Sequence, residues 1–341
     1  MQSNWKEFLN KQGATLIDDV VCDFGDAAAE LTATAQGTVL ADLGQFGTLR
    51  VSGEDAQSFL QNLLSNDIRE VSATQSQFSS FNSAKGRMLA NFLISRESDD
   101  YLLQLPASLT EAMRKKLSMY VMRAKVKITD ISNELIILGL SGNSAPHILQ
   151  AQGWALPESV LGLSQNQTAC IIKYSNTRFQ LNLNPEQAEA LWMSLHALAT
   201  PVGSASWDWF NIRAGLPVIL PATQEQFVPQ MANFDLIGGI NFKKGCYPGQ
   251  EIVARMHYLG KLKRRMYLAH VDSATAPQAG DELYGTEPAG QSCGMIANAA
   301  VAPQGGYDVL AVIQSESHDA NAVHLSSGAQ LQFEALPYPL P

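Results

Sequence analysis

One cysteine in this 341-residue chain stands where a thiol is expected to react. Cys246 closely follows Lys243 and Lys244, and the residues after it predict a short helix from about Pro248 to Leu259. Proline suits the first position of a helix, where its missing N–H costs nothing. Unpaired N–H groups at a helix start and nearby ammonium groups both favour a thiolate over a thiol. The spacing therefore predicts a reactive cysteine in the loop before this helix.

A packing role for Cys246 is the alternative, because a lone cysteine often behaves as a small buried hydrophobe. Spacing alone supports the two roles about equally. The residues around it favour the loop, since Lys244, Gly245, Tyr247 and Pro248 do not make the sequence of a core strand.

The charge of the chain is unevenly distributed. With 23 basic and 32 acidic residues, its formal net charge is −9, and 46% of its residues are hydrophobic. This balance argues against a protein dedicated to wrapping nucleic acid or coating an anionic membrane. The segment from Lys243 to Val271 instead holds seven Lys or Arg residues and one acid, Glu251. Such a run is commonly a solvated face, but its place beside Cys246 favours an anionic partner.

The other cysteines and the histidines predict neither disulfides nor a metal site. The four cysteines are far apart and form no Cys-x-x-Cys pair, and the six histidines form no His-x-x-x-His pair. This usage fits a reducing compartment. The first residues are too polar for a signal peptide, and no apolar run reaches membrane-spanning length. We therefore expect a soluble, cytoplasmic protein with no membrane partner.

Three parts are predicted to position the Cys246 loop. Residues 1–140 predict an N-terminal α+β domain, which from about residue 40 has the strand and helix order of a ferredoxin-like layer. Residues 141–262 predict a second α+β domain that carries the loop. Residues 263–341 alternate short apolar runs with Gly, Pro, Asp and Ser turns, which predicts a small antiparallel β-barrel.

Several elements are specific enough to check against a structure. Apolar periodicity predicts helices over Glu54–Leu64 and Leu109–Arg123, and a capped helix over Ser206–Gly215. Ala84–Arg87 predicts a hairpin turn. The first 38 residues or so predict only a short helix and an irregular lead-in.

We expect a tryptophan and a glycine-rich motif to have structural roles. Trp192 lies on the apolar face of a predicted helix, where packing in the core is its expected role. Gly290–Gly294 matches the Gly-x-Ser-x-Gly pattern of a hydrolase nucleophile, which has meaning only between a strand and a helix. Here Pro288 precedes it and a strand-like run follows, so we expect a hairpin turn.

The run Lys244–Glu251, Lys-Gly-Cys-Tyr-x-Gly-Gln-Glu, resembles the signature of the YgfZ-type folate-binding, tRNA-modifying proteins. These are relatives of the glycine-cleavage T-protein, an aminomethyltransferase. Trp207–Pro217 is similar to the family's helix that leads into Ala-Gly-x-Pro. The resemblance implies an α+β, T-protein-like multi-domain fold, with ferredoxin-like layers around a central folate cavity and a C-terminal antiparallel β-barrel. It also implies tetrahydrofolate or a derivative as the cofactor.

The resemblance implies roles for individual residues. A tryptophan that lines the family's folate pocket falls on Trp207, although a plain core role is almost as well supported; a second falls on Phe46. Cys246 would be a nucleophile or a transient ligand. Lys244 and Arg255 would stabilise its thiolate or hold an anion, and Glu251 would orient the loop.

Three positions depart from the T-protein pattern. The glutamate that holds the pterin in the T-protein relatives is replaced by Arg213, which would pair with a folate carboxylate or with nothing. The aspartate pair of the one-carbon transfer falls on Ala90 and Asn91. The sequence therefore favours an accessory folate-binding factor over a standard aminomethyltransferase.

The implied function is folate-dependent support of iron–sulfur enzymes, including tRNA methylthiotransferases. Two alternatives stay open. One is a tetrahydrofolate-dependent one-carbon transferase, and the other is a module that binds tRNA directly without catalysis.

Overall fold

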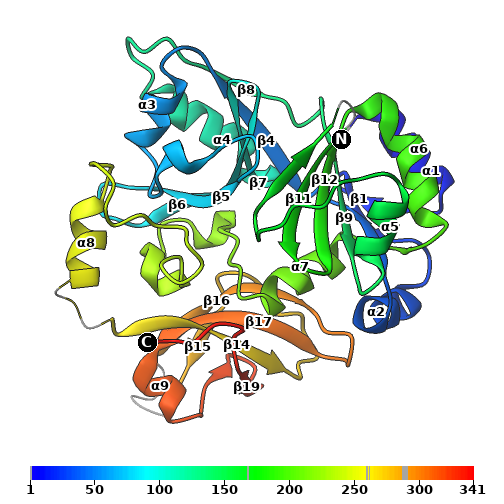
Figure 1. Ribbon diagram of the computed structural model, residues 1–341. Coiled ribbons are helices and arrows are strands. Elements are labelled where there is room, and N and C mark those ends of the chain that lie inside the picture. The colour runs from blue at the N-terminus through cyan, green and yellow to red at the C-terminus, as the bar shows by residue number, and fades with distance from the viewer. Residues whose placement is uncertain (1, 167–168, 259, 261, 286–290) are drawn as a thin grey trace. The chain divides into compact units, whose positions relative to one another are not determined.

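A computed structural model describes residues 2–166, 169–258, 260, 262–285 and 291–341 (Figure 1). The chain divides into two compact units, each made of several segments. Unit 1 consists of Met1–Phe59, Arg69–Gln77 and Leu93–Trp207, and unit 2 consists of Leu60–Ile68, Phe78–Phe92 and Asp208–Pro341. The division into three domains at residues 140 and 262 stays a prediction.

The described helices and strands are as follows. The α-helices are α1 Ser3–Lys11, α2 Ala27–Gln36, α3 Ala56–Gln61, α4 Ala107–Ser118, α5 Ala145–Ala151, α6 Pro185–His196, α7 Ser204–Arg213, α8 Gln250–Tyr258 and α9 Ser315–Asp319. The strands are β1 Thr15–Ile17, β2 Val20–Asp23, β3 Val39–Asp42, β4 Phe46–Ser52, β5 Gln77–Asn82, β6 Met88–Glu97, β7 Asp100–Pro106, β8 Lys127–Asp130, β9 Ile136–Ser141, β10 Leu163–Gln165, β11 Ala169–Ser175, β12 Arg178–Leu183, β13 Thr200–Val202, β14 Arg264–Val271, β15 Glu282–Tyr284, β16 Ser292–Val301, β17 Tyr307–Gln314, β18 His324–Leu325 and β19 Leu331–Glu334.

A six-stranded sheet forms the centre of unit 1. Its strand order is β10-β11-β12-β9-β3-β13, antiparallel except for the parallel pair of β3 and β13. Helices α1, α5 and α6 cover one face (Figure 1) and bury their apolar stripes against it. Trp192 of α6 is fully buried there, stacked on Phe24 and edge-on to Trp5. The expected core role of Trp192 is confirmed.

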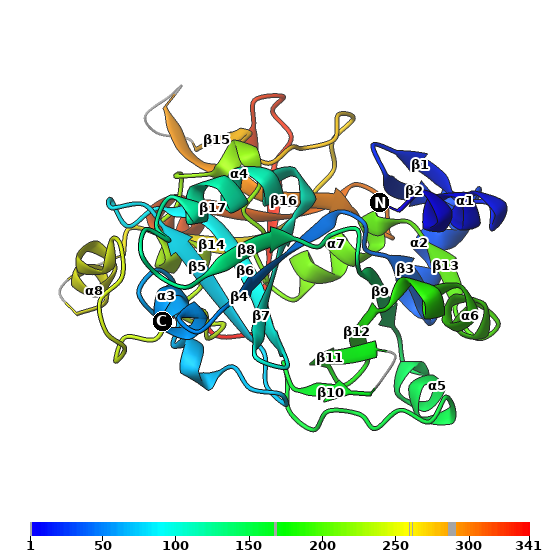
Figure 2. The ribbon, with the colours of Figure 1, turned by 90° about the horizontal axis from the view of Figure 1, so that it is seen from above.

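The start of the chain is more regular than the sequence predicted. It forms α1, a hairpin of β1 and β2 beside it, and α2 (Figure 2). Trp5 and Leu9 fix α1 in the core of unit 1, and Asp26 caps α2 by accepting a hydrogen bond from the Ala29 N–H at 3.0 Å. The prediction of an irregular lead-in was wrong, because the contacts that order this segment come from residues far along the chain, such as Trp192.

The predicted ferredoxin-like pattern produces a second sheet, with strand order β5-β6-β7-β4-β8. Helix α4 packs against β4, β7 and β8. It ends at Ser118 rather than Arg123, because the chain turns there and leaves Met119 and Met122 70% and 90% exposed. Helix α3 is likewise shorter than predicted, spanning Ala56–Gln61. The hairpin turn between β5 and β6 is confirmed, with Ser83 N–H donating to the Arg87 carbonyl at 2.8 Å.

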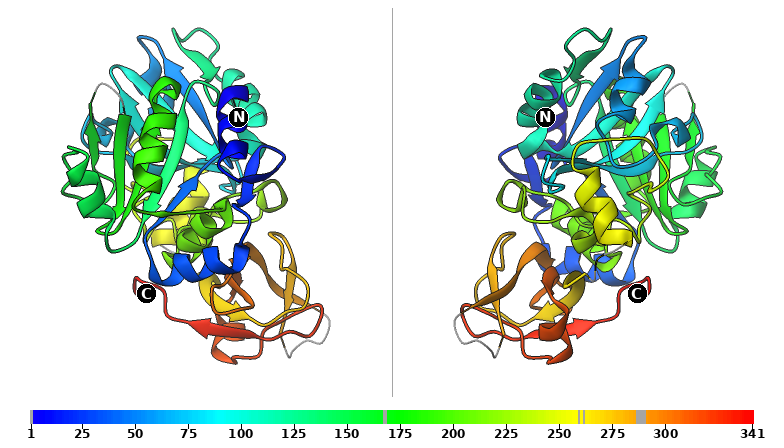
Figure 3. Two further views of the ribbon diagram at one scale, coloured as in Figure 1. Left: turned by 90° about the vertical axis from the view of Figure 1, so that its right-hand side faces the viewer. Right: turned by 90° about the vertical axis from the view of Figure 1, so that its left-hand side faces the viewer.

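The C-terminal part of unit 2 is an antiparallel sheet that curls as a half-barrel (Figure 3). Its order is β18-β15-β16-β17-β14-β19. The two ends of this order approach each other, since the Leu331 N–H donates to the Val323 carbonyl at 2.8 Å. The predicted β-barrel is confirmed in this form. Ser292 and Cys293 lie in β16, and Gly290 lies outside the described residues.

Within the described residues, every helix is too short or too polar to cross a lipid bilayer.

Candidate functional site

The Cys246 loop is fastened to unit 2 by the residue two positions before the cysteine. Lys244 is 5% exposed, and its ammonium donates to three backbone carbonyls, those of Gln61 at 2.7 Å, Asn66 at 3.1 Å and Leu64. A buried ammonium has three donors to satisfy, and three carbonyl oxygens accept from it. Lys244 thus ties the loop to residues 61–66.

The residues after the cysteine fasten the other side of the loop. Tyr247 is 7% exposed and lies under the Lys244 ammonium, whose Nζ is 5.1 Å from the ring centroid. Burial raises the pKa of the Tyr247 phenol, so the ring stays neutral. Gly249 has a φ of +76°, and a Cβ there would lie 2.5 Å from the Cα of Gly86. Only glycine fits this approach to the turn between β5 and β6.

Between these anchors, Gly245 and Cys246 are exposed. Gly245 has no atom within 4 Å of where its Cβ would be. The structure therefore presents the Cys246 thiol to solvent, as the sequence pattern predicts. Four of the signature residues (Lys244, Tyr247, Gly249, Gln250) are buried or half-buried, so the signature is largely a holder for the cysteine.

Two of the other cysteines are poor nucleophiles. Burial raises the pKa of Cys170 to about 12, and the charge of Glu97 adds to the shift. Burial also raises the pKa of Cys293. Burial therefore disfavours the thiolate at Cys170 and Cys293. Cys22 and Cys246 are the exposed cysteines of the described chain.

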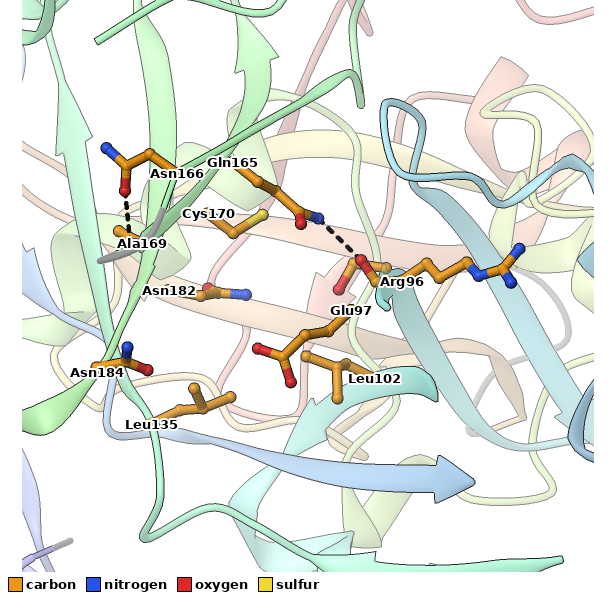
Figure 4. A pocket seen from close by; sticks show the side chains of 11 residues that line it. Arg96, Glu97, Leu102, Leu135, Gln165, Asn166, Ala169, Cys170, Asn182 and Asn184 are labelled. Atoms are coloured by element: carbon orange, nitrogen blue, oxygen red, sulfur yellow. Dashed lines mark hydrogen bonds between the residues drawn. The ribbon is translucent and has the colours of Figure 1, made fainter. Parts of the chain in front are cut away.

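Cys170 faces a small polar cavity of unit 1 (Figure 4). The cavity holds about 80 Å³ and is lined by amides such as Gln165 and Asn182 and by the Glu97 carboxylate. The Gln165 amide donates to the Arg96 carbonyl oxygen at 2.8 Å. Drug-sized ligands occupy roughly 300–1,000 Å³, so this cavity is too small for a folate.

The helix after the loop begins two residues later than predicted. Helix α8 spans Gln250–Tyr258, and Leu259 lies outside the described residues. Glu251 is in its first turn and Arg255 one turn later, both exposed. In the described part of the chain, neither makes a hydrogen bond or an ion pair with Cys246, so their roles stay predictions.

The basic run is divided between internal and exposed cations. The Arg265 guanidinium makes two hydrogen bonds to the Asp235 carboxylate, at 2.8 and 2.9 Å, and Lys244 is held as described above. These two serve the fold. Lys243, Arg255 and Lys263 are exposed, and Lys261 lies outside the described residues.

Trp207 is 1% exposed and packs within unit 1. The Arg178 guanidinium lies over its ring at 3.9 Å from the centroid, and Tyr174 meets it edge-on at 5.5 Å. A Cβ at Gly139 would lie 2.4 Å from the indole, so the backbone closes on the ring there. The indole N–H is buried without a hydrogen-bond partner in the described residues. Sequence reasoning missed Arg178, because nothing near it in the chain signals the contact with Trp207.

Phe46 lies at a different cavity of unit 1, also of about 80 Å³, beside Asp42 and Trp5. The Trp5 indole and the Gly44 N–H donate to the Asp42 carboxyl at 2.8 and 3.0 Å. Burial outweighs these bonds and raises the pKa of Asp42 to about 6. Trp207 does not line this cavity. The volume of the cavity is again too small for a folate.

The departures from the T-protein pattern serve the fold of unit 2. Arg213 pairs with Asp308 at 3.4 Å and also with Glu334, rather than pairing with nothing. The Asn91 amide donates to the Pro217 carbonyl at 2.9 Å, and its oxygen accepts from the Ile219 N–H at 2.8 Å.

Comparisons with known proteins agree with the fold. The model of the GCVT N-terminal domain matches residues 21–237. A tRNA-modifying protein YgfZ of Colwellia psychrerythraea is 32% identical over 231 residues, 67% of this chain and 71% of that protein. Another, of Photorhabdus laumondii, is 29% identical over 91% of this chain and 95% of that protein. The crystal structure of glycine cleavage system aminomethyltransferase T from Bartonella henselae superposes with a TM-score of 0.82 at 18% identity, covering 99% of this chain and 97% of that one. That likeness shows a shared fold.

Proposed function

Because this chain belongs to the GCVT N-terminal domain family, and within it to the YgfZ-type proteins, we propose that it is an accessory factor in tRNA modification whose reactive group is Cys246. One observation carries the proposal. Lys244 and Tyr247 are 5% and 7% exposed, while Cys246 between them is open to solvent. The loop keeps its neighbours buried and one thiol exposed.

The finer proposal concerns what the thiol serves. Cys246 supports iron–sulfur enzymes that thiolate tRNA, as a nucleophile or as a transient thiolate ligand. Thiolate sulfur is a preferred ligand of iron–sulfur clusters. Exposed Arg255 stabilises the thiolate or holds an anionic group of the partner, and Glu251 orients the loop from the first turn of α8. The Lys244 ammonium, which was expected to act with Arg255, donates to three carbonyl oxygens, so exposed Lys243 takes its place in this proposal.

The second part of the proposal is a bound reduced folate, tetrahydrofolate or a derivative. The T-protein-like fold supports it, as does the indole of Trp207, since a flat pterin stacks well on such a ring. The Arg178 guanidinium now lies over Trp207 at 3.9 Å. A pterin therefore stacks on that face only after Arg178 leaves it, and neither small cavity at Phe46 or Cys170 has the necessary volume.

The thiol is tested by replacing Cys246 with Ser and with Ala. Cells that lack the native protein are complemented with each variant, and methylthiolated tRNA is measured by mass spectrometry of nucleosides. We expect a loss of the modification for both variants. Cys22→Ser is the matched control, because Cys22 is also exposed. Undiminished modification with Cys246→Ala would remove the residue from the mechanism.

The folate is tested by the quenching of tryptophan fluorescence with reduced folates. We expect saturable quenching by the wild type and a weaker, shifted response in Trp207→Phe. Trp192→Phe is the matched control, because Trp192 is equally buried in unit 1. Equal affinities of all three proteins would exclude Trp207 from the folate site.

The aminomethyltransferase alternative is not favoured. A carboxylate is required at Ala90 or Asn91, but Ala90 is fully buried and both ends of the Asn91 amide bind backbone groups of residues 217 and 219. Turnover of methylene-tetrahydrofolate with an amine acceptor would revive it.

A further inference from the structure

Three aromatic side chains gather at the C-terminal end of α8 in unit 2. Phe242, in the Cys246 loop, stacks face to face on His257, with ring centroids 3.7 Å apart and planes at 12°. Tyr258 meets His257 edge-on at 4.7 Å. We refer to Phe242, His257 and Tyr258 as the aromatic platform.

The aromatic platform is anchored to the core through Phe242, and its other two rings are exposed to solvent. Phe242 is half-buried and packs against the core of unit 2, which fixes the base of the stack. His257 is exposed, and Tyr258 is 65% exposed. A large aromatic ring held this far in water gains little from burial, so packing alone does not explain its place. A supported, outward-facing stack is instead suited to receive another flat ring.

Three exposed cations are close to the aromatic platform in the sequence. Lys243 follows Phe242 in the loop, Arg255 lies on α8, and Lys263 follows the helix; all three are exposed. Within the described part of the chain, no carboxylate forms an ion pair with any of them. The acid of this segment, Glu251, is six residues from His257 along α8, about 9 Å at 1.5 Å per residue. The segment that carries the platform is thus basic, although the chain as a whole has a net charge of −9.

We propose that the aromatic platform, with Lys243, Arg255 and Lys263, is a binding site for unpaired bases of RNA. Rings that stack on aromatic side chains while cations contact the phosphates are the common means of binding single-stranded nucleic acid. Bases in a duplex are already stacked on each other, so loops and single strands are the targets. The inference rests on the proposed function, and it names the loop regions of the tRNA substrate as the partner.

The platform also places the RNA near the thiol. Phe242 and Cys246 are four residues apart, so their Cα atoms are separated by at most about 14 Å. A nucleotide stacked on the exposed rings that Phe242 supports is therefore within the reach of a partner enzyme that engages Cys246.

The inference is tested by fluorescence anisotropy with three probes: unmodified tRNA, a labelled single strand of about 12 nucleotides, and a blunt duplex of the same sequence. We expect the full-length protein to bind tRNA and the single strand more tightly than the duplex. Tyr258→Ala and His257→Ala should each weaken binding of the single strand about five- to a hundredfold, since stacking contributes about 1–3 kcal/mol per base. Tyr258→Phe, which keeps the ring, should retain wild-type affinity.

The chain offers matched controls for both kinds of contact. His318 stacks on Tyr267 at 3.9 Å and 13°, a pair like that of His257 and Phe242, but it neighbours Asp319. Lys127 is exposed on β8 in unit 1. His318→Ala and Lys127→Ala should bind RNA as the wild type does, whereas Lys243→Ala and Lys263→Ala should each lower the slope of log affinity against log salt by about 1.

Two results would overturn the inference: no RNA binding by the wild type, or equal binding by the wild type and Tyr258→Ala. In either case the Cys246 proposal is judged separately, by the nucleoside assay. Loss of RNA affinity in Tyr258→Ala with full methylthiolation in Cys246→Ala would uphold the RNA site and refute the role of the thiol.

Discussion

Two adjacent lysines, Lys243 and Lys244, have different physical roles at the scale of single residues. Lys243 is exposed, while the Lys244 ammonium is buried against three carbonyl oxygens. Replacing Lys244 with Met removes all three hydrogen bonds and leaves buried acceptors unsatisfied, each worth about 1–3 kcal/mol.

We therefore expect Lys244→Met to lower the free energy of unfolding by about 3 kcal/mol or more in urea titrations. Lys243→Met, the matched control, should change it by less than about 0.5 kcal/mol. Equal effects of the two substitutions would contradict the anchoring role of Lys244.

The sequence predicted the exposed thiol correctly but misassigned part of the charge around it. The loop around Cys246 was readable because Gly245, Pro248 and Gly249 are local signals. The basic run was counted as a single group, although Lys244 and Arg265 are used inside the fold. Their partners, Gln61 and Asp235, are 183 and 30 residues away. A count of charges along the chain contains no information on such distant partners.

A cross-strand pair determines a pH response at the scale of elements. His270 of β14 faces Asp308 of β17, and the two side chains are hydrogen-bonded at 2.8 Å. Burial alone would lower the pKa of His270, but the carboxylates of Asp308 and Asp272 outweigh it and raise the pKa above its ordinary value. The folded protein thus binds a proton at His270 more tightly than the unfolded chain does.

Tighter proton binding by folded His270 stabilises the folded protein. This stabilisation is fully present below the unfolded pKa of histidine, about 6.5, and is lost as pH rises through the raised folded pKa. We expect the free energy of unfolding to fall over this range in the wild type, and to fall less in His270→Gln. Urea titrations at several pH values measure both. Parallel pH profiles for the two proteins would argue against the pair.

The turn before α8 gives a second prediction at this scale. Gly249 has a φ of +76° and lies against the backbone of Gly86, whereas Gly245 has open space where a Cβ would be. Gly249→Ala should lower the free energy of unfolding by about 1–3 kcal/mol, because the new side chain strains the backbone and displaces the β5–β6 turn. Gly245→Ala should leave the thermal midpoint within about 2 °C of the wild type. A stable Gly249→Ala variant would mean that the loop does not require this close approach.

Element prediction was strongest where signals are local. The strands of the C-terminal half-barrel are each bounded by turn residues, and their assignment is confirmed. The end of α4 was misjudged because Tyr120 and Val121 continue the apolar period, although the chain turns after Ser118. The N-terminal hairpin and α2 were missed because they are stabilised by distant contacts.

At the scale of the whole molecule, the two units are interleaved along the chain. The chain passes between them at residues 59/60, 68/69, 77/78, 92/93 and 207/208. Four of the described α-helices and strands cross these junctions, because α3, β5, β6 and α7 each have residues in both units. Melting one unit would therefore break elements that belong to the other.

We expect a single cooperative unfolding transition. Four tryptophans (Trp5, Trp154, Trp192, Trp207) lie in unit 1, so their fluorescence reports mainly on that unit, while far-ultraviolet circular dichroism reports on both. The two midpoints should coincide. Separate midpoints would show that the units unfold independently.

The open space around Gly245 has a consequence for the size of what can reach the sulfur. A side chain on either side of a cysteine normally screens it from bulky reagents, yet here one neighbour has none and the other, Tyr247, is turned inward. The side chains next to Cys246 in the sequence therefore do little to screen its sulfur. We expect a protein-sized reagent to be hindered little more than a small electrophile, which suits a thiol used between macromolecules.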